Sequence, residues 1–217
     1  MQFLYNLQAG KEVIELNGEE VKHLKARRLK EGARLVVKNL CDNYDYLYEI
    51  MLFAKNSAKL ELVFSSLMQS KENLTTLAWA VVEPSVVEKT LPSLNELGLG
   101  KLVLVYADFS QKDVRLDLQR MRRILINSCE QCGRGDLMRV EVLGSSDELL
   151  QNYPQTALLD FGTPHIASAQ TQMFFVGPEG GFSERERELF CQKVGLNSRY
   201  ILRSNTAATA VASLLLT

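Results

Sequence analysis

The chain has 217 residues, 46% of them hydrophobic, and a formal net charge of -1. This composition excludes a disordered chain and is enough for one large folded domain or two small ones. The near-neutral charge excludes a general basic field, so nucleic-acid binding would have to come from local patches. The N-terminus lacks a signal-peptide pattern and no apolar stretch is long enough to span a bilayer, so we expect a cytoplasmic protein without a membrane segment.

Four cysteines are scattered along the chain: Cys41, Cys129, Cys132 and Cys191. They are too few for a disulfide scaffold, which agrees with a reducing compartment. Cys129 and Cys132 form the only close pair, but a zinc site takes four ligands and neither histidine lies at ligand spacing. We therefore predict no metal site.

Short apolar segments rich in β-forming residues characterise the first part of the chain. They predict the strands of a small sheet or barrel at residues 1–7, 34–40, 46–52 and 59–67. The stretch "CDNYD", residues 41–45, predicts a turn because Asp and Asn favour local hydrogen bonds.

One short helix is predicted at residues 19–30, before Gly32. Its sequence "HLKARRLK" concentrates several cationic side chains: His23, Lys25, Arg27 and Arg28 belong to it. Both a solvated helix face and a patch that contacts RNA are consistent with this composition.

The polar stretch "MQSKENLTT", residues 68–76, predicts a domain boundary, so we expect one domain at residues 1–70 and another at 71–217. Strands and helices alternate after it. Apolar strands are predicted at residues 77–82, 101–107, 137–143, 156–160 and 172–177. Continuous apolar strands between helices indicate an α/β fold with a parallel sheet that is covered on both faces, which also places Trp79 and the phenylalanines of "MFFV" in the core.

Two helices of this second domain carry clear signals. Ser85 and Glu88 match a capping box ahead of apolar residues spaced for one helical face, and Gly98 is the predicted stop. A second helix is predicted at residues 116–131.

The stretch "FFVGPEGGFSERE", residues 174–186, leaves a predicted strand and enters a helix that Ser183 and Glu186 cap. Ligands of open α/β sheets bind at such strand ends, and glycine lets a ligand approach the backbone closely. The loop matches neither GxGxxG nor a P-loop. It is either a ligand-binding loop or a plain tight turn.

A second junction of the same kind lies at residues 199–217, where a short strand, a loop and an alanine-rich helix are predicted. Ser204, Asn205 and Thr206 are all capable N-caps. The two junctions are therefore predicted to form two walls of one cleft.

At these residues the chain resembles the RsmE family of 16S rRNA uracil-N3 methyltransferases. "GPEGGFSERE" and "ILRSNTAATAVASLL" resemble its two C-terminal signatures. "HLKARRLKEGARLVV", "LNELGLGKLVLVYADFSQ" and "RMRRILINSCEQCGRGDLMRVEV" resemble its earlier segments in the same order, the last with an EQ-x-x-R element at Glu130, Gln131 and Arg134. The resemblance covers nearly the whole chain.

The resemblance implies a small PUA-like β-barrel for RNA, followed by a SPOUT-type α/β methyltransferase domain with a mostly parallel sheet and a deep trefoil knot. It implies a cytoplasmic homodimer that uses S-adenosylmethionine to methylate N3 of a uridine in 16S rRNA of the small ribosomal subunit, without a metal or membrane.

Candidate site residues follow from the resemblance and from the chemistry of the implied reaction. The expected cofactor-binding residues come from both junctions: Val176, Gly177, Pro178, Glu179, Gly180, Gly181, Ile201, Leu202, Arg203, Asn205, Thr206, Ala207 and Ala208. Arg203 is expected to stabilise the uracil anion, and Glu179 or Glu130 to take the proton. The expected RNA contacts are His23, Lys25, Arg27, Arg28, Arg123 and Arg134.

The chain departs from the family pattern at a few positions. It reads "LRSNTA", with Ser204 and Asn205, where the family commonly reads LRTETA, and "ADFSQ" lacks the arginine of the SERS-like stretch. Three alternatives remain open: a SPOUT enzyme that methylates another RNA atom, a non-catalytic RNA-binding relative, and a Rossmann-type nucleotide enzyme.

Overall fold

The computed structural model describes residues 2–68, 74–168 and 171–216. The chain forms two compact units: unit 1 comprises Met1–Lys71 and Ile126–Leu137, and unit 2 comprises Glu72–Leu125 and Met138–Thr217. Of the boundary predicted at residues 68–76, residues 69–73 lie outside the described part. Among the described residues, no helix has the length and apolar character needed to cross a membrane.

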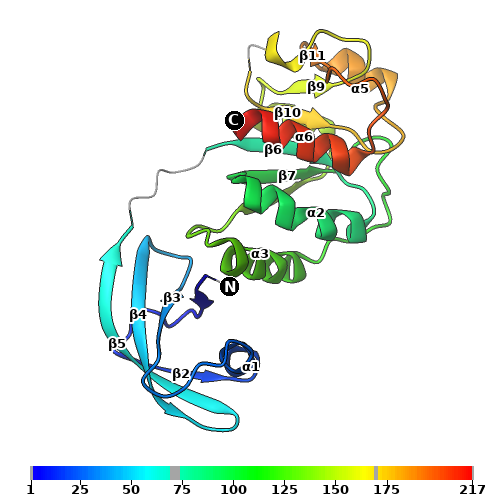
Figure 1. Ribbon diagram of the computed structural model, residues 1–217. Coiled ribbons are helices and arrows are strands. Elements are labelled where there is room, and N and C mark those ends of the chain that lie inside the picture. The colour runs from blue at the N-terminus through cyan, green and yellow to red at the C-terminus, as the bar shows by residue number, and fades with distance from the viewer. Residues whose placement is uncertain (1, 69–73, 169–170, 217) are drawn as a thin grey trace. The chain divides into compact units, whose positions relative to one another are not determined.

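Unit 1 is built on a five-stranded sheet in the order β1-β3-β4-β5-β2 (Figure 1). Its strands are Leu4–Tyr5 (β1), Val13–Asn17 (β2), Arg34–Lys38 (β3), Tyr44–Phe53 (β4) and Ser57–Leu67 (β5). β1 pairs with β3 in parallel, and the other pairs are antiparallel. Leu16, Leu24, Val37 and Leu60 are among the residues of its core.

Two elements of unit 1 differ from the prediction. β2 was not predicted, although its burial alternates, because Ile14 and Leu16 are its only buried residues. Helix α1 covers only Glu19–Ala26. It ends early because Arg28 adopts a left-handed backbone conformation, with φ of 56°, that an α-helix cannot accommodate.

Unit 2 is built on a six-stranded sheet in the order β11-β9-β10-β6-β7-β8, and all its pairs are parallel. Its strands are Thr76–Ala80 (β6), Lys101–Val105 (β7), Arg139–Leu143 (β8), Ala157–Leu159 (β9), Phe174–Val176 (β10) and Lys193–Val194 (β11). The predicted α/β fold with a parallel sheet is confirmed.

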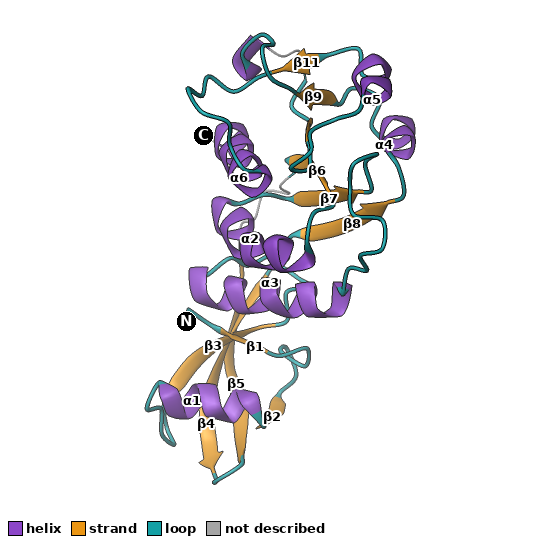
Figure 2. Ribbon diagram, turned by 90° about the vertical axis from the view of Figure 1, so that its right-hand side faces the viewer, coloured by secondary structure: helices purple, strands orange, loops and turns teal. Residues whose placement is uncertain are grey.

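Helices cover both faces of this sheet. They are Pro84–Leu97 (α2), Ser146–Asn152 (α4), Glu184–Leu189 (α5) and Ser204–Leu216 (α6), with a short 3-10 helix at Ile166–Ser168. Helix α3, Leu118–Cys132, begins in unit 2, and its residues from Ile126 onward belong to unit 1. Figure 2 shows α2 and α6 on one side of the sheet and α4 and α5 on the other. Trp79, Phe174 and Phe175 are buried, as predicted.

The start of α2 was predicted wrongly. Its N-cap is Glu83, no side chain caps the helix, and Pro84 occupies its first turn, so Ser85 lies inside the helix. Proline at this position has a preset helical φ and no N–H to satisfy. Glu88 instead pairs with Arg120 across 2.9 Å. The predicted stop is confirmed, because Gly98 is left-handed with φ of 96°.

Three further differences concern short segments. No strand forms at residues 199–202, where Ile201 is 82% exposed. Helix α4 and strand β11 were not predicted, because seven and two residues carry little periodic signal.

Candidate functional site

A cavity of about 290 Å³ opens at the carboxyl ends of β9 and β10 in unit 2. The two predicted junctions both contribute to its wall, together with the loop after β9. Its lining residues are Leu159, Asp160, Phe161, Val176, Gly177, Pro178, Glu179, Gly181, Phe182, Ile201, Leu202, Arg203, Ser204 and Ala207. The predicted cleft between the two junctions is therefore present.

A second hollow of about 150 Å³ adjoins the first and shares Asp160, Phe161 and Leu202 with it. Its other wall comes from the segment after β11, which contributes Gly195, Leu196, Ser198 and Tyr200. The two hollows together form one recess along the edge of the sheet where β9 and β11 lie.

The residues predicted to bind a cofactor fall into two groups. Those that line the cavity are Val176, Gly177, Pro178, Glu179, Gly181, Ile201, Leu202, Arg203 and Ala207. Gly180, Asn205, Thr206 and Ala208 are not among the lining residues. The sequence-based prediction missed Asp160 and Phe161. Their position directly after β9 is the signal that points to them, because ligands bind at the carboxyl ends of parallel strands.

The glycine-rich loop has different requirements at each glycine. A Cβ on Gly177 would lie 2.9 Å from Cε2 of the buried Phe182 ring, so no side chain fits there. Gly181 has φ of 71° and donates its N–H to the Pro178 carbonyl across 3.0 Å, which closes a turn. A Cβ on Gly180 would lie 3.5 Å from Phe109 Cβ, so this glycine faces Phe109.

Ser204 joins the two junctions. Its hydroxyl donates to the Gly177 carbonyl across 2.5 Å and accepts from the Trp79 indole N–H across 2.7 Å. Both partners come from other parts of unit 2, and Trp79 and Ser204 are buried. The hydroxyl is needed because only a group that both donates and accepts can bridge an N–H and a carbonyl. Ser204 therefore does not serve as the predicted N-cap.

Asp160 connects the loop after β9 with helix α5. Its carboxylate accepts from Arg187 Nε across 2.7 Å and from the backbone N–H of Phe161 across 2.9 Å. The Asp160 carboxylate raises the pKa of the Arg187 guanidinium, because a hydrogen-bonded negative charge favours the cation. This ion pair fixes one side of the cavity to the helix that follows the glycine-rich loop.

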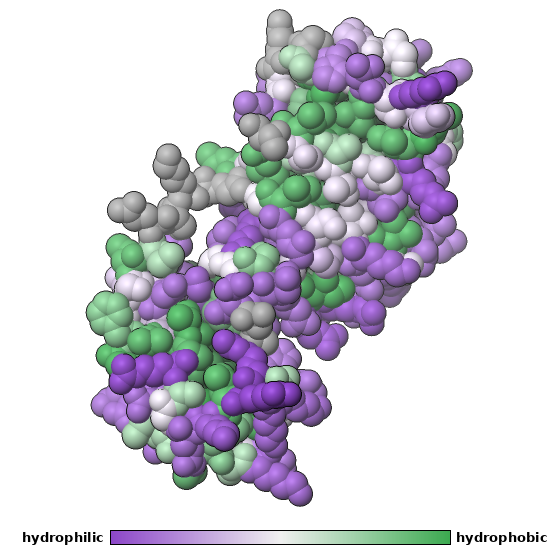
Figure 3. All heavy atoms as spheres, in the orientation of Figure 1, coloured by the Kyte–Doolittle hydropathy of each residue, from purple (hydrophilic) through white to green (hydrophobic). Residues whose placement is uncertain are grey.

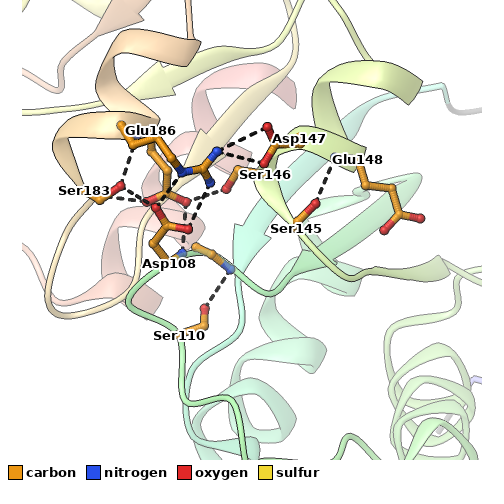
Figure 4. A network of polar contacts seen from close by, with 10 residues as sticks. Asp108, Ser110, Ser145, Ser146, Asp147, Glu148, Ser183 and Glu186 are labelled. Atoms are coloured by element: carbon orange, nitrogen blue, oxygen red, sulfur yellow. Dashed lines mark hydrogen bonds and ion pairs between the residues drawn. The ribbon is translucent and has the colours of Figure 1, made fainter.

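A polar network holds the start of α5 (Figure 4). Ser183 and Glu186 form the predicted capping box, which is confirmed. The Glu186 carboxylate is fully buried and accepts from the backbone N–H groups of Ser183 and Asp108, each across 3.1 Å, and from the Ser146 hydroxyl across 2.5 Å. It therefore joins the loops after β7, β8 and β10 at one point.

Arg185 extends this network toward solvent. Its guanidinium contacts Asp108 in the loop after β7 across 3.0 Å and Asp147 in helix α4 across 2.9 Å, so one cation joins α5 to both. The hydrogen bond from Arg185, followed by that from Ser183, lowers the pKa of the Asp108 carboxyl. The network fixes the loop after β7 against the helix that follows the glycine-rich loop.

The three residues predicted to be catalytic lie in two places. Arg203 and Glu179 are exposed and line the same cavity. Glu130 belongs to unit 1, is 4% exposed and accepts from the Tyr5 backbone N–H across 2.7 Å. Burial raises the pKa of the Glu130 carboxyl, because desolvation disfavours its charged form.

The residues predicted to contact RNA differ in accessibility. Lys25, Arg27, Arg28 and Arg123 are exposed. His23 is half-buried, and its Nδ1 has no hydrogen-bond partner among the described residues. The Arg134 side chain is only 8% exposed and pairs with Asp136 across 2.6 Å, so little of it is available to a phosphate.

Comparison with known proteins places both units among RNA-modifying proteins. Residues 69–216 match the family model of an RNA methyltransferase domain, and residues 16–63 match that of an RNA methyltransferase PUA domain. The chain is 41% identical to ribosomal RNA small subunit methyltransferase E of Helicobacter pylori (strain ATCC 700392 / 26695), with 99% of each chain covered. It is 24% identical to the protein of that name from Aquifex aeolicus, covering 100% of this chain and 99% of that one.

Solved structures show the same fold at lower identity. Ribosomal RNA small subunit methyltransferase E from Neisseria gonorrhoeae, bound to S-adenosyl methionine, superposes with a TM-score of 0.82 at 23% identity, covering 99% of this chain and 96% of that one. A probable rRNA methyltransferase from Porphyromonas gingivalis gives a TM-score of 0.84 at 19% identity, covering 99% and 97%. The predicted fold class, a PUA-like unit with a SPOUT-type α/β unit, is confirmed. The trefoil knot stays a prediction, because strand order does not describe how a chain is threaded.

Proposed function

This chain belongs to the family of ribosomal RNA small subunit methyltransferase E, and from that premise we propose that it methylates N3 of a uridine in 16S rRNA with S-adenosylmethionine. The observation that carries the proposal is the cavity at the ends of β9 and β10, where both sequence signatures of the family meet. The alternatives are an RNA methyltransferase with another target atom and a non-catalytic relative.

The cavity suits S-adenosylmethionine in shape and charge. Ala207 is a small residue of the lining and leaves room for a ligand beside helix α6. Glu179 places a carboxylate in the wall, which favours a ligand that carries a sulfonium cation, whereas the Asp160 carboxylate is already paired with Arg187. When bound, S-adenosylmethionine supplies the electrophilic methyl group.

The chain's own residues have two tasks in the transfer. They align the uracil with the methyl group, because an in-line displacement requires near-attack geometry. They also stabilise the anion that forms as N3 loses its proton, and in this proposal the guanidinium of Arg203 does so from the cavity wall. We assign the proton to Glu179, since it lies in the same cavity, whereas Glu130 already accepts from Tyr5 in unit 1.

The remaining assignments complete the proposal. Residues 1–70 would form the RNA-binding domain and residues 71–217 the methyltransferase domain of a cytoplasmic homodimer. RNA would contact the exposed cations Lys25, Arg27, Arg28 and Arg123, and also His23 on α1. The match of residues 16–63 to an RNA methyltransferase PUA domain supports this division of work.

The test is a methylation assay on small ribosomal subunits with labelled S-adenosylmethionine, followed by nucleoside analysis. We expect N3-methyluridine from the wild type. Ala207→Trp should abolish both the product and the binding of S-adenosylhomocysteine, because Ala207 lines both hollows and its replacement fills them.

Leu214→Trp is the matched control, since Leu214 lies on the same helix and is exposed outside the cavity. A methyl group on a 2′-hydroxyl or on another base atom would reject the assigned target. A folded wild type that binds RNA but not S-adenosylhomocysteine would reject an enzyme.

A further inference from the structure

Phe109 is a large aromatic side chain that stays exposed at the end of a parallel strand. It follows β7 in unit 2 and is 56% exposed. An exposed aromatic residue needs no explanation by itself. The residues before and after it in the chain are both held by hydrogen bonds.

Asp108 and Ser110 fix the backbone on either side of Phe109. The Asp108 N–H donates to buried Glu186 across 3.1 Å, and its carboxylate accepts from the Ser183 hydroxyl across 2.5 Å. Ser110 is buried, its N–H donates to the Ala107 carbonyl across 3.0 Å, and its hydroxyl accepts from the Ala107 N–H across 3.1 Å. The chain therefore presents the Phe109 ring on a rigid turn, which lowers the entropic cost of any contact that the ring makes.

The position of this turn links Phe109 to the cavity. A Cβ on Gly180 would lie 3.5 Å from Phe109 Cβ, and the neighbours of Gly180, Glu179 and Gly181, line the cavity. Phe109 itself is not among the lining residues. It therefore stands beside the glycine-rich loop, next to the space for a cofactor and outside it.

A base that is methylated on a ring atom has to leave its stack and be held by its faces. Stacking on an aromatic ring does this, because it engages the face of the base and leaves the N3 edge free to react. An aromatic ring can stack on any base, and it contributes more to binding free energy when the protein already holds the ring in place.

We infer that Phe109 is the residue on which the target base stacks during methyl transfer. This inference rests on the proposed function, and it names the contact that positions the substrate. Phe161 is the other exposed phenylalanine near the site, but it lines both hollows and so belongs to the space assigned to the cofactor.

The test compares Phe109→Leu with Phe109→Tyr. Leucine keeps an apolar side chain against Gly180 but has no flat π face, whereas tyrosine keeps the ring. At saturating S-adenosylmethionine, we expect Phe109→Leu to lower kcat/KM for small ribosomal subunits about 5- to 150-fold, the usual range for one base–aromatic stack. Phe109→Tyr should stay within about 3-fold of the wild type, because the stacking surface is retained.

Binding of S-adenosylhomocysteine separates this role from a structural one. Both variants should bind it like the wild type, whereas Phe161→Leu, the matched change of an exposed phenylalanine, should weaken it. Equal loss of S-adenosylhomocysteine affinity and of kcat/KM in Phe109→Leu would show that Phe109 only supports the glycine-rich loop, and would overturn the inference.

Two other outcomes would also overturn the role inferred for Phe109. Wild-type kcat/KM in Phe109→Leu would remove Phe109 from substrate binding while leaving the proposed function intact. A wild-type protein that forms no methylated nucleoside would overturn the proposed function, and this inference with it.

Discussion

Ser204 joins two segments of the site through one hydroxyl group. It lies 27 positions from Gly177 and 125 from Trp79 in the sequence, yet its hydroxyl bonds both. Threonine offers the same hydroxyl and could therefore bridge the same two groups. Asn205, the next residue, lies outside the cavity lining.

Replacing Ser204 by alanine should lower both stability and cofactor affinity. The change leaves the buried Trp79 N–H without its partner, which costs about 1–3 kcal/mol in the free energy of unfolding. It also releases the Gly177 carbonyl, so S-adenosylhomocysteine should bind more weakly in calorimetry. Ser204→Thr is the control and should retain both properties. Unchanged affinity in a destabilised Ser204→Ala protein would show that the bond serves stability alone.

A variant of Arg203 can separate cofactor binding from the methyl-transfer step. Its guanidinium carries the proposed stabilisation of the uracil anion, so Arg203→Ala should slow the methylation step about 10²- to 10³-fold, the usual cost of removing one such group. Single-turnover rates with small subunits measure this. S-adenosylhomocysteine affinity should change little, since an alanine leaves the backbone of the loop intact. An unchanged rate would exclude Arg203 from the reaction.

Helix α5 acts as the fixed end of the glycine-rich loop. Ser183 caps its N-terminus, Glu186 closes the box from inside, and Arg187 holds Asp160 across the cavity wall. Six residues are too few for a stable isolated helix, so these polar contacts define the element. These contacts fix α5, and α5 in turn fixes the C-terminal end of the glycine-rich loop that precedes it.

The capping serines of α5 and α4 allow a matched comparison. Ser183 and Ser145 each accept a hydrogen bond from the backbone three residues on, across 3.1 Å. Alanine at either position should cost roughly 0.5–2 kcal/mol of stability in denaturant unfolding. Only Ser183→Ala should also weaken S-adenosylhomocysteine binding, because α4 does not follow the glycine-rich loop. Equal weakening by both changes would contradict a specific role for α5.

Glu130, near the end of helix α3, makes a testable contribution to pH dependence. Burial raises the pKa of this carboxyl in the folded state, so its stabilising contribution is full below the unfolded pKa and is lost as pH rises through the folded value. Glu130→Gln keeps an acceptor for the Tyr5 N–H without a charge. In thermal unfolding, we expect the difference in stability between Glu130→Gln and the wild type to shift in favour of the variant as the pH is raised from about 4 to about 8. A constant difference across this range would contradict the raised pKa.

Over the whole molecule, positive and negative charges nearly cancel, so any attraction to RNA has to come from local groups of cations. The formal net charge is -1, and hydrophilic residues are spread over both units on the face seen in Figure 3. Under the proposed function, association with rRNA would therefore depend on a few accessible cations, such as those on and after α1. Lys22 on the same helix pairs with Glu19 and is partly neutralised.

Salt dependence distinguishes these cations. Arg27→Gln should reduce the slope of log Kobs against log salt concentration by about 1, because one phosphate contact is lost. Lys22→Gln should change the slope less, since Glu19 already balances that charge. Filter binding of 16S rRNA fragments over a salt series measures both. If Lys22→Gln changes the slope as much as Arg27→Gln does, RNA contact is not specific to Arg27.

The sequence by itself determined the alternation of strands and helices, the cap of α5, the stop of α2 and the two loops that meet in the cavity. Periodic burial and caps are local properties, so a single chain reveals them. The tertiary structure alone decided that Asp160 and Phe161 join these loops, that Gly180 faces Phe109, and that Ser204 bonds Trp79. Such contacts depend on which strands become neighbours in the sheet. β9, β10 and β6 are adjacent in space although long segments separate them in sequence, and no local period encodes that order.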